Sequence, residues 1–228
     1  MADQARRPSS ATANEYLIQL YLMLRERRPV VGARIAERIG VSAAAVSQAL
    51  KRLEQRKLVV IDPDDGVRLS QRGTVQAEHT IRRHYLLERL LVDVLGFDWV
   101  DVDEEADKLE HSLSPRLEEH LFEQLGRPTT CPHGNPFPGS PDERRLLDAP
   151  RLTGAHAGER TEILRITEEA EENEELMRRL DQDHLVPGTR ITVSSISDAE
   201  VVFRKDATGQ EITLPTGYAR YVRVDTNN

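Results

Sequence analysis

The chain has 228 residues, of which 38% are hydrophobic and 31% charged, as expected of a folded, helix-rich protein. No apolar run approaches the ~20 residues of a membrane-spanning helix, and residues 1–10 lack the apolar core of a secretory signal. A single cysteine, Cys131, excludes an internal disulfide framework. We therefore expect a protein of the reducing cytoplasm with no membrane partner.

The charges are distributed unevenly along the chain. Its net charge is −8, which taken alone argues against a nucleic-acid partner. However, residues 1–73 hold 13 Lys and Arg against 8 Asp and Glu, whereas the remainder holds 18 against 31. A basic first third on an acidic body is typical of a protein in which one domain meets phosphate.

The first predicted helix follows a flexible arm, residues 1–11. It begins at Thr12, with Glu15 three residues later as in a capping box, and its apolar positions include Leu17, Leu20 and Leu24. Glu15 has two open roles. It could cap the helix by accepting a hydrogen bond from the Thr12 amide, or it could bind a metal ion.

Two short helices at 32–39 and 42–57 predict a helix-turn-helix, with Gly40 in the turn and Ser42 as the cap of the second helix. Small side chains on that second helix allow close approach to a duplex, Gln48 can bond base edges, and basic residues can meet phosphates. An ordinary helical hairpin is the alternative. The outward residues are Ala43, Ala44, Ala45, Ser47, Gln48, Lys51 and Arg52.

A β-hairpin is predicted directly after these helices. Its strands are 58–61 and 67–70, with a turn at 62–66 between them. A hairpin in this place is the wing of a winged helix, and Arg68 would lie near the DNA backbone. Helix, turn, basic helix and wing in this order predict binding to double-stranded DNA.

A long helix is predicted from 73 to about 95, with a polar first half and an apolar second half. Together with Leu109, Leu113, Leu117 and Leu121, that apolar half offers more surface than one chain hides. Part of it must be intrachain core, and the rest predicts a symmetric homodimer. The two recognition helices of the dimer, one helical turn of DNA apart, would then fit an approximately palindromic site.

Acidic residues and a histidine converge at 101–113. At 100° per residue, Asp103, Asp107, Glu110 and His111 share one helical face, and His84 and Glu88 stand four apart on the preceding helix. Oxygen and imidazole donors arranged in this way suit a divalent first-row cation. A solvated acidic face is the alternative.

The segment 131–139, CPHGNPFPG, is interpreted as a structural loop rather than a metal site, because Cys131 and His133 have no second such pair. Residues 140–156 are predicted to be a linker. Five short strands follow, at 162–166, 190–193, 200–203, 211–214 and 218–224, and predict a small antiparallel barrel. An acidic helical insertion at 168–183 is interpreted as a solvated face.

This order of parts resembles the diphtheria toxin repressor family of metal-dependent transcriptional repressors over nearly the full length. The resemblance rests on ATANEYLIQLYLM, ARIAERIGVSAAAVSQALKRLEQRKLV, RRHYLLERLLVDVLG, DEEADKLEHSLS and CPHGNPFPG. It implies a mainly α fold with small β parts. The implied domains are a winged helix-turn-helix at 1–73, a helical dimerisation and metal-binding domain at 74–139, a linker at 140–156, and an SH3-like (FeoA-like) barrel at 157–226.

By position, the resemblance implies two neighbouring metal sites. The main site would comprise Glu15, Asp107, Glu110 and His111. The second would use His84, Glu88 and Asp103, with Glu172 and Glu175 as the matching positions of the SH3-like domain. The DNA-reading positions would be Ser42, Ala44, Ala45, Ser47 and Gln48.

Two departures from the iron-responsive members bear on the metal. Those members carry methionine at the position of Glu15 and cysteine at that of Asp107, and hard oxygens in place of soft sulfurs favour Mn²⁺. We expect a Mn²⁺-activated homodimeric repressor of metal-uptake genes, with Co²⁺ or Zn²⁺ able to substitute in vitro. The alternatives are an Fe²⁺-responsive repressor, a metal-dependent hydrolase, and a winged-helix sensor of an organic ligand.

Overall fold

The computed structural model describes residues 13–27, 30, 32–62 and 66–225. Thr12, the arm at 1–11 and most of the predicted hairpin turn lie outside the described residues. The chain forms two compact units, 1–81 and 82–228, and each is described by itself. Within the described part, none of the helices combines the length and the apolar character needed to cross a bilayer.

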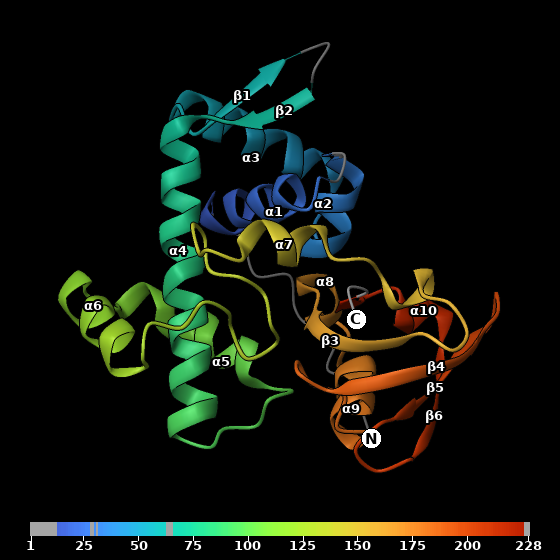
Figure 1. Cartoon of the computed structure of the whole chain (residues 1–228). Helices are drawn as coiled ribbons and strands as arrows, with labels where there is room; N and C mark the ends of the chain where they lie inside the picture. Colours follow the sequence, from blue (N-terminus) through green and yellow to red (C-terminus); the bar gives the residue numbers. More distant parts are fainter. Residues whose placement is uncertain (1–12, 28–29, 31, 63–65, 226–228) are drawn as a thin grey trace, which may run out of the picture. The chain divides into compact units, whose positions relative to one another are not determined.

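The first unit is the expected winged helix (Figure 1). Helices α1 (Ala13–Arg25), α2 (Gly32–Ile39) and α3 (Ala43–Gln55) precede the hairpin of β1 (Val59–Asp62) and β2 (Gly66–Leu69). Ser42 caps α3, since its Oγ accepts a hydrogen bond from the Ala45 amide at 3.2 Å. Apolar positions at helical spacing form the core, among them Leu17, Leu20, Ile35, Val46 and Leu53.

Helix α4 (Gln71–Arg89) starts in the first unit and continues into the second, ending in a π-helical turn at Leu90–Val94. The predicted helix at 73–95 is thus confirmed as one continuous segment. Helix α5 (Val102–Leu109), a 3-10 turn (Glu110–Ser112) and α6 (Pro115–Gln124) follow. The side chains that stay exposed here include Val94, Leu95, Leu109 and Leu117.

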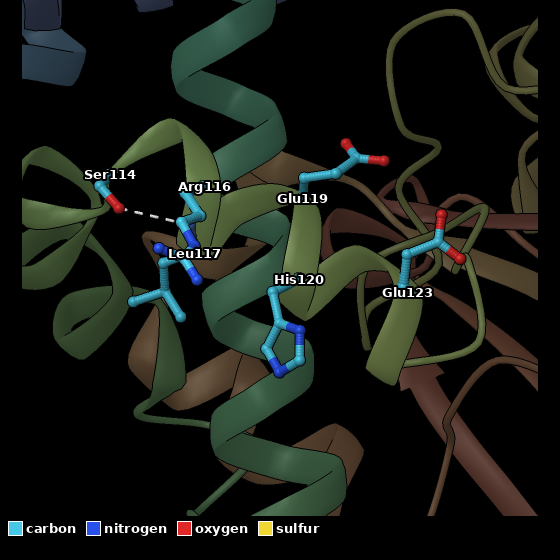
Figure 2. A pocket seen from close by; sticks show the side chains of 6 residues that line it. All are labelled: Ser114, Arg116, Leu117, Glu119, His120 and Glu123. Atoms are coloured by element: carbon cyan, nitrogen blue, oxygen red, sulfur yellow. Dashed lines mark hydrogen bonds between the residues drawn. The ribbon is translucent and has the colours of Figure 1, made fainter.

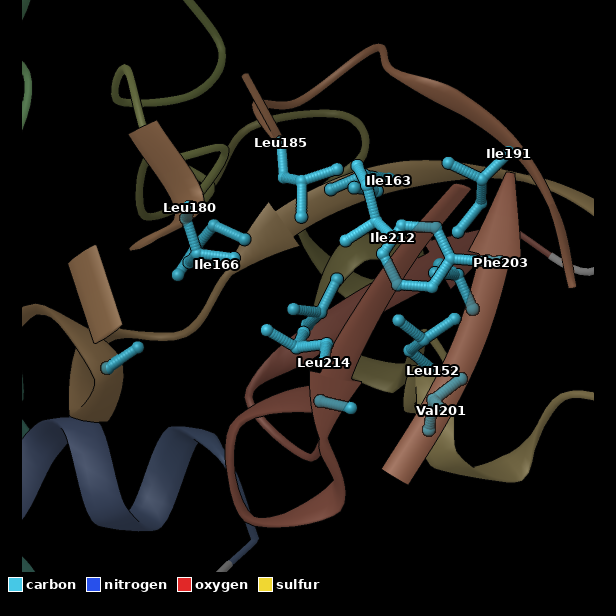
Figure 3. Packing of buried hydrophobic residues seen from close by; sticks show 14 of the residues in the cluster. Leu152, Ile163, Ile166, Leu180, Leu185, Ile191, Val201, Phe203, Ile212 and Leu214 are labelled. Carbon is cyan, nitrogen blue, oxygen red and sulfur yellow. The ribbon is translucent and has the colours of Figure 1, made fainter. Parts of the chain in front are cut away.

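The C-terminal barrel has five antiparallel strands in the order β6-β5-β4-β3-β7. They are β3 (Arg160–Ile166), β4 (Arg190–Ile196), β5 (Glu200–Lys205), β6 (Glu211–Pro215) and β7 (Val222–Asp225). Helices α8 (Glu168–Glu171) and α9 (Glu174–Gln182) connect β3 to β4. Alternate residues of the strands point inward and pack against α9, as Figure 3 shows for Leu180, Ile163 and Phe203.

Two details differ from the sequence-based predictions. The segment 140–156 contains α7 (Glu143–Asp148) and a 3-10 turn (Leu152–Gly154), and Leu152 is fully buried in the barrel core. The segment 140–156 has too few apolar residues at a regular spacing to reveal a helix, and its sequence therefore predicts a linker. Tyr218, predicted to lie in the last strand, lies in the short helix α10 (Thr216–Ala219), and the strand begins at Val222.

Candidate metal centre

The centre is built on α4, which presents His84 and Glu88 from one face because they stand four residues apart. Both side chains are buried, and Glu88 is fully shielded from solvent. Nε2 of His84 lies 3.1 Å from Oε1 of Glu88. A carboxylate in this position requires a compensating positive charge or a proton, because an isolated buried charge is too costly.

Helix α5 and the turn after it bring three more carboxylates to the same imidazole. Nε2 of His84 lies 3.2 Å from Oδ1 of Asp103. Its Nδ1 lies 3.2 Å from Oδ1 of Asp107 and 3.3 Å from Oε2 of Glu110. Val102 and Ala106 are fully buried and fix α5 in this orientation. One ring nitrogen therefore faces Glu88 and Asp103, and the other faces Asp107 and Glu110.

The predicted ligands divide differently from the implied two-site scheme. His84 lies between both carboxylate pairs rather than beside one. His111 is largely exposed and approaches Glu110, with 3.4 Å between its Nδ1 and Oε1. Glu15 lies in the first turn of α1, in the other unit, and is exposed.

The loop after α6 contributes a second group of ligand atoms that the sequence analysis did not assign to a metal. Ligand atoms of Glu88, Cys131 and His133 all lie within 4.8 Å of one another, and all three residues are buried. Nδ1 of His133 also lies 3.4 Å from Oε1 of Glu171 in the barrel domain. The interpretation of 131–139 as a purely structural loop is therefore incomplete, because Glu88 and Glu171 supply the partners that the local sequence lacks.

The tautomer of His133 is fixed by Trp99. Nε2 of His133 lies 3.0 Å from the Trp99 carbonyl oxygen, which can only accept, so Nε2 carries the proton. The lone pair of Nδ1 then points toward Glu88 and Glu171. Within the described residues, Nδ1 of His133 and Oε2 of Glu88 are buried without a hydrogen-bond partner. Buried acceptors facing one another in this way fit a bound cation.

The electrostatics of this group agree with that interpretation. Burial raises the pKa of Cys131 well above 9.0, and the nearby Glu88 and Glu171 raise it further. Burial also raises the pKa of Glu168 to about 7, with Glu88 adding to the effect, although Tyr85 donates a hydrogen bond to its carboxylate. The pKa of Glu171 is raised by burial and by Glu168. A divalent cation would reverse these shifts, because it stabilises thiolate and carboxylate forms.

The pKa of His84 is set by two opposing effects. Burial lowers it, but hydrogen bonds to the four surrounding carboxylates outweigh burial and raise it well above 6.5. An imidazolium at this place can balance the carboxylates in the absence of a metal ion, and it must lose a proton before it can bind one.

The barrel residues at the centre differ from those implied by the resemblance. Glu168 and Glu171 stand three apart on α8 and face the same side. Glu168 is half-buried and accepts a hydrogen bond from the Tyr85 hydroxyl, whereas the Glu171 side chain is only 3% exposed and lies beside His133. Glu172 and Glu175 are exposed, and Glu175 bonds the Tyr218 hydroxyl instead. An acidic run does not itself reveal which of its members turn inward, and on α8 these are Glu168 and Glu171.

The surface predicted to face DNA is the outer side of α3 in the first unit. Its predicted contact residues are exposed except Ala45, which is half-buried. Arg68 on the wing is exposed and lies 4.0 Å from Asp62. The exposed positions are Ser42, Ala44, Ser47, Gln48, Lys51, Arg52 and Arg68.

A surface pocket on α6 takes no part in the metal centre. Its lining comes from one helix face, where Ser114 caps the helix by accepting from the Leu117 amide (Figure 2). His120 and Glu123 also line it, but no metal-ligand group of the described residues includes them.

Three family models match the chain in sequence order. Residues 9–67 match the N-terminal DNA-binding domain of iron-dependent repressors. Residues 70–139 match the metal-binding and dimerisation domain of the same repressors, and residues 151–226 match the FeoA domain. The three matches together cover most of the chain.

Individual relatives agree over nearly their whole lengths. The iron-dependent repressor IdeR of Mycobacterium leprae is 34% identical over 223 residues, covering 94% of this chain and 96% of that protein. A manganese-dependent transcriptional repressor in complex with manganese is 29% identical, with a TM-score of 0.82, covering 94% of this chain and 100% of that one. IdeR of T. acidophilum is 26% identical, with a TM-score of 0.77, covering 96% of this chain and 100% of that one. The chain therefore belongs to the diphtheria toxin repressor family of metal-dependent transcriptional repressors and carries the family's C-terminal SH3-like domain.

Proposed function

We propose that this protein is a cytoplasmic, homodimeric repressor that binds operator DNA when Mn²⁺ is bound and controls genes of metal-ion uptake. The observation that carries the proposal is the donor set around His84, in which Glu88, Asp103, Asp107 and Glu110 all lie within 3.3 Å of a ring nitrogen. Carboxylate and imidazole ligands suit Mn²⁺, which binds oxygen more readily than sulfur.

The proposed ligands fall into two neighbouring groups. The first is Asp107, Glu110 and His111, with His84 between the groups and Glu15 supplied by the first unit. The second is Glu88, Asp103, Cys131 and His133, with Glu168 and Glu171 from α8. This assignment keeps the ligands that the resemblance implies, except that α8 takes the place of Glu172 and Glu175.

The Fe²⁺-responsive alternative retains specific support. Cys131 is a soft ligand in the second group, and sulfur favours iron or zinc over manganese. The relative from Mycobacterium leprae is named an iron-dependent repressor. Against this, Glu15 and Asp107 stand where the iron-responsive members carry both sulfur ligands of the first group, which supports Mn²⁺.

The proposed switch is a change in the balance of charge. A bound cation supplies positive charge to a cluster of carboxylates. Without it, the carboxylates repel one another, and the DNA-binding units are free to vary in spacing. When ligands from both units bind the cation, the spacing of the two recognition helices that fits DNA is favoured. The exposed Val94, Leu95 and Leu117 are proposed to pack against the second copy.

We also propose that the cation has a regulatory and not a hydrolytic role. A basic winged helix with exposed Gln48, Lys51 and Arg52 accounts for a DNA partner, which a hydrolase would not need. Phosphoester hydrolysis by the metal-loaded protein would contradict this view.

The test uses metal-stripped full-length protein and fluorescence anisotropy. The DNA is enriched from random-sequence duplexes in separate selections with Mn²⁺ and with anaerobic Fe²⁺. We expect Mn²⁺ to increase DNA affinity by about 5- to 150-fold, the usual range of coupling between two binding sites. Equal affinity with and without any metal would refute the proposal, and activation by Fe²⁺ at lower free concentration than Mn²⁺ would establish the alternative.

A further inference from the structure

The loop that carries Cys131 and His133 lies directly against strand β3 of the barrel. The Ile166 amide donates to the His133 carbonyl at 2.8 Å. Gly134, with a φ of +86°, approaches so closely that a Cβ would lie 2.3 Å from the Leu164 carbonyl oxygen. The barrel domain therefore fixes the backbone of this loop.

Asn135, the next residue, is buried and makes a polar bridge. Its Nδ2 donates to the Ile166 carbonyl oxygen at 2.9 Å and to Oε1 of Glu171 at 2.8 Å. That carboxylate oxygen is the one that lies 3.4 Å from Nδ1 of His133. Asn135 thus contacts a proposed ligand, while its own Oδ1 accepts a hydrogen bond from Arg165.

Arg165 on β3 determines which way the Asn135 amide points. Only 1% of Arg165 is exposed, and its Nη1 donates to Oδ1 of Asn135 at 2.8 Å while Nε donates to the Leu146 carbonyl at 2.9 Å. A guanidinium has no acceptor, so it must face the oxygen of the amide and not the nitrogen. The NH₂ group is thereby directed toward Glu171.

We infer that Asn135 is a positioning residue of the metal centre, which holds the Glu171 carboxylate against His133 and is itself oriented by Arg165. The inference rests on the proposed metal centre and deepens it. Partners of this kind tune ligand orientation and usually change metal affinity when removed. The SH3-like domain then contributes an orienting network in addition to a ligand.

The test titrates metal-free full-length protein with Co²⁺. The chain has one cysteine and one tryptophan, so a thiolate-to-Co²⁺ absorption band reports on Cys131 and fluorescence quenching reports on Trp99, whose ring lies 4.6 Å from that of His133. We expect Asn135→Ala to weaken Co²⁺ binding by about 10- to 100-fold by both signals. Asn173→Ala is the matched control, because Asn173 caps α9 by accepting from the Leu176 amide and contacts none of the proposed ligands in the described contacts; its affinity should stay within about twofold.

A double-mutant cycle separates positioning from a general loss of structure. If Asn135 acts through Glu171, Asn135→Ala should change Co²⁺ affinity by less than about twofold in a Glu171→Ala background. An equal loss of affinity in both backgrounds, or an unchanged affinity in Asn135→Ala, would refute the positioning role of Asn135 but not the proposed metal centre. A wild-type protein with neither a thiolate band nor quenching of Trp99 would refute the second ligand group, and absence of the band alone would refute ligation by Cys131. Should Asn135→Ala fail to fold by circular dichroism, Arg165→Lys gives the same measurement. A smaller loss is expected, because the lysine amine can still donate to Oδ1 of Asn135 but lacks the planar fork that orients the amide.

Discussion

Nδ1 of His133 lies 3.4 Å from Oε1 of Glu171, so that two acceptor atoms from distant parts of the chain face each other in the interior. Neither atom can hydrogen-bond the other unless one is protonated. A cation between them removes the conflict and joins the loop at 131–136 to α8. This pair supports our proposal that the C-terminal domain contributes a ligand to the metal centre.

The first prediction concerns this pair. His133→Gln should remove one imidazole ligand from the second ligand group. Its Co²⁺ affinity should fall by about 10- to 100-fold, the loss usual even for residues that only orient a ligand. The thiolate absorption band should weaken in parallel. His120→Gln is the matched control, because His120 lies on α6 outside the ligand groups. Equal metal affinity in both variants would show that His133 is not a ligand.

The second prediction concerns stability and pH in the metal-free protein. The pKa of Glu168 is raised from 4.5 to about 7, so the folded state holds its proton more tightly than the unfolded state. Its contribution to stability is complete below about pH 4.5 and is lost as pH rises through about 7. The loss is at most roughly 3 kcal/mol. The raised pKa of His84 acts in the same direction, with its contribution present below 6.5 and lost at higher pH.

Thermal unfolding of wild type and Glu168→Gln between about pH 4.5 and 8 measures this effect. The unfolding free energy of the wild type should fall relative to that of Glu168→Gln as pH rises. Mn²⁺ should stabilise the wild type more at about pH 8 than at about pH 5, because protons compete with the cation. A difference that is independent of pH would contradict the assignment of a raised pKa to Glu168.

Much of the fold could be predicted because its signals are local. Apolar spacing located α1, α3 and α4, and Ser42 marked the start of α3. Helical spacing also brought Asp103, Asp107 and Glu110 to one side, where all three meet His84. Charges on one helix share a face by geometry alone.

Glu88 and Asp103 were predicted, but Cys131, His133 and Glu171 could not be assigned to the second group from the sequence because their contacts join distant segments. Cys131 and His133 form an incomplete set until Glu88 and Glu171 are placed beside them, 43 and 38 residues away in the sequence respectively. Glu171 stood in an acidic run that is typical of a solvated surface. The one local signal was Gly134 between His133 and Asn135, since such a glycine marks a close backbone approach.

The third prediction tests metal preference. The double variant Glu15→Met, Asp107→Cys places two soft sulfur ligands in the first group. The ratio of Mn²⁺ to Fe²⁺ concentrations needed for half-maximal DNA binding should rise by about tenfold or more. Glu37→Met, Asp101→Cys makes the same chemical changes at exposed positions outside the centre and should leave the ratio unchanged. An unchanged ratio in the first variant would mean that Glu15 and Asp107 do not set metal preference.

The fourth prediction separates sequence recognition from phosphate binding on α3. Gln48→Ala should lower affinity for the enriched DNA by about 10- to 100-fold and leave affinity for random duplex nearly unchanged, as expected for a base-edge contact. Lys51→Ala should weaken both and reduce the salt dependence by about one unit of slope. Gln55→Ala, at the exposed end of the same helix, is the control. Equal losses on both DNAs for Gln48→Ala would contradict a base contact.

The fifth prediction compares two glycines that both have positive φ but differ in how closely other atoms approach them. Gly134 and Gly209 have φ values of +86° and +70°. A Cβ on Gly134 would meet β3 at 2.3 Å, whereas no atom in the described part of the chain lies within 4 Å of a Cβ on Gly209. Gly209→Ala should therefore cost only the backbone strain, about 1 kcal/mol. Gly134→Ala should cost more and should also displace the loop that carries His133.

The two variants are compared by thermal unfolding and by quenching of Trp99 fluorescence with Co²⁺. Gly134→Ala should lose quenching at Co²⁺ concentrations that saturate the wild type, since the clash with the Leu164 carbonyl separates the loop from β3. Gly209→Ala should quench like the wild type. If Gly134→Ala binds Co²⁺ with wild-type affinity while it is destabilised more than Gly209→Ala, then docking of the loop stabilises the fold without shaping the metal centre. Loss of affinity together with loss of stability is the result that ties the barrel domain to metal binding.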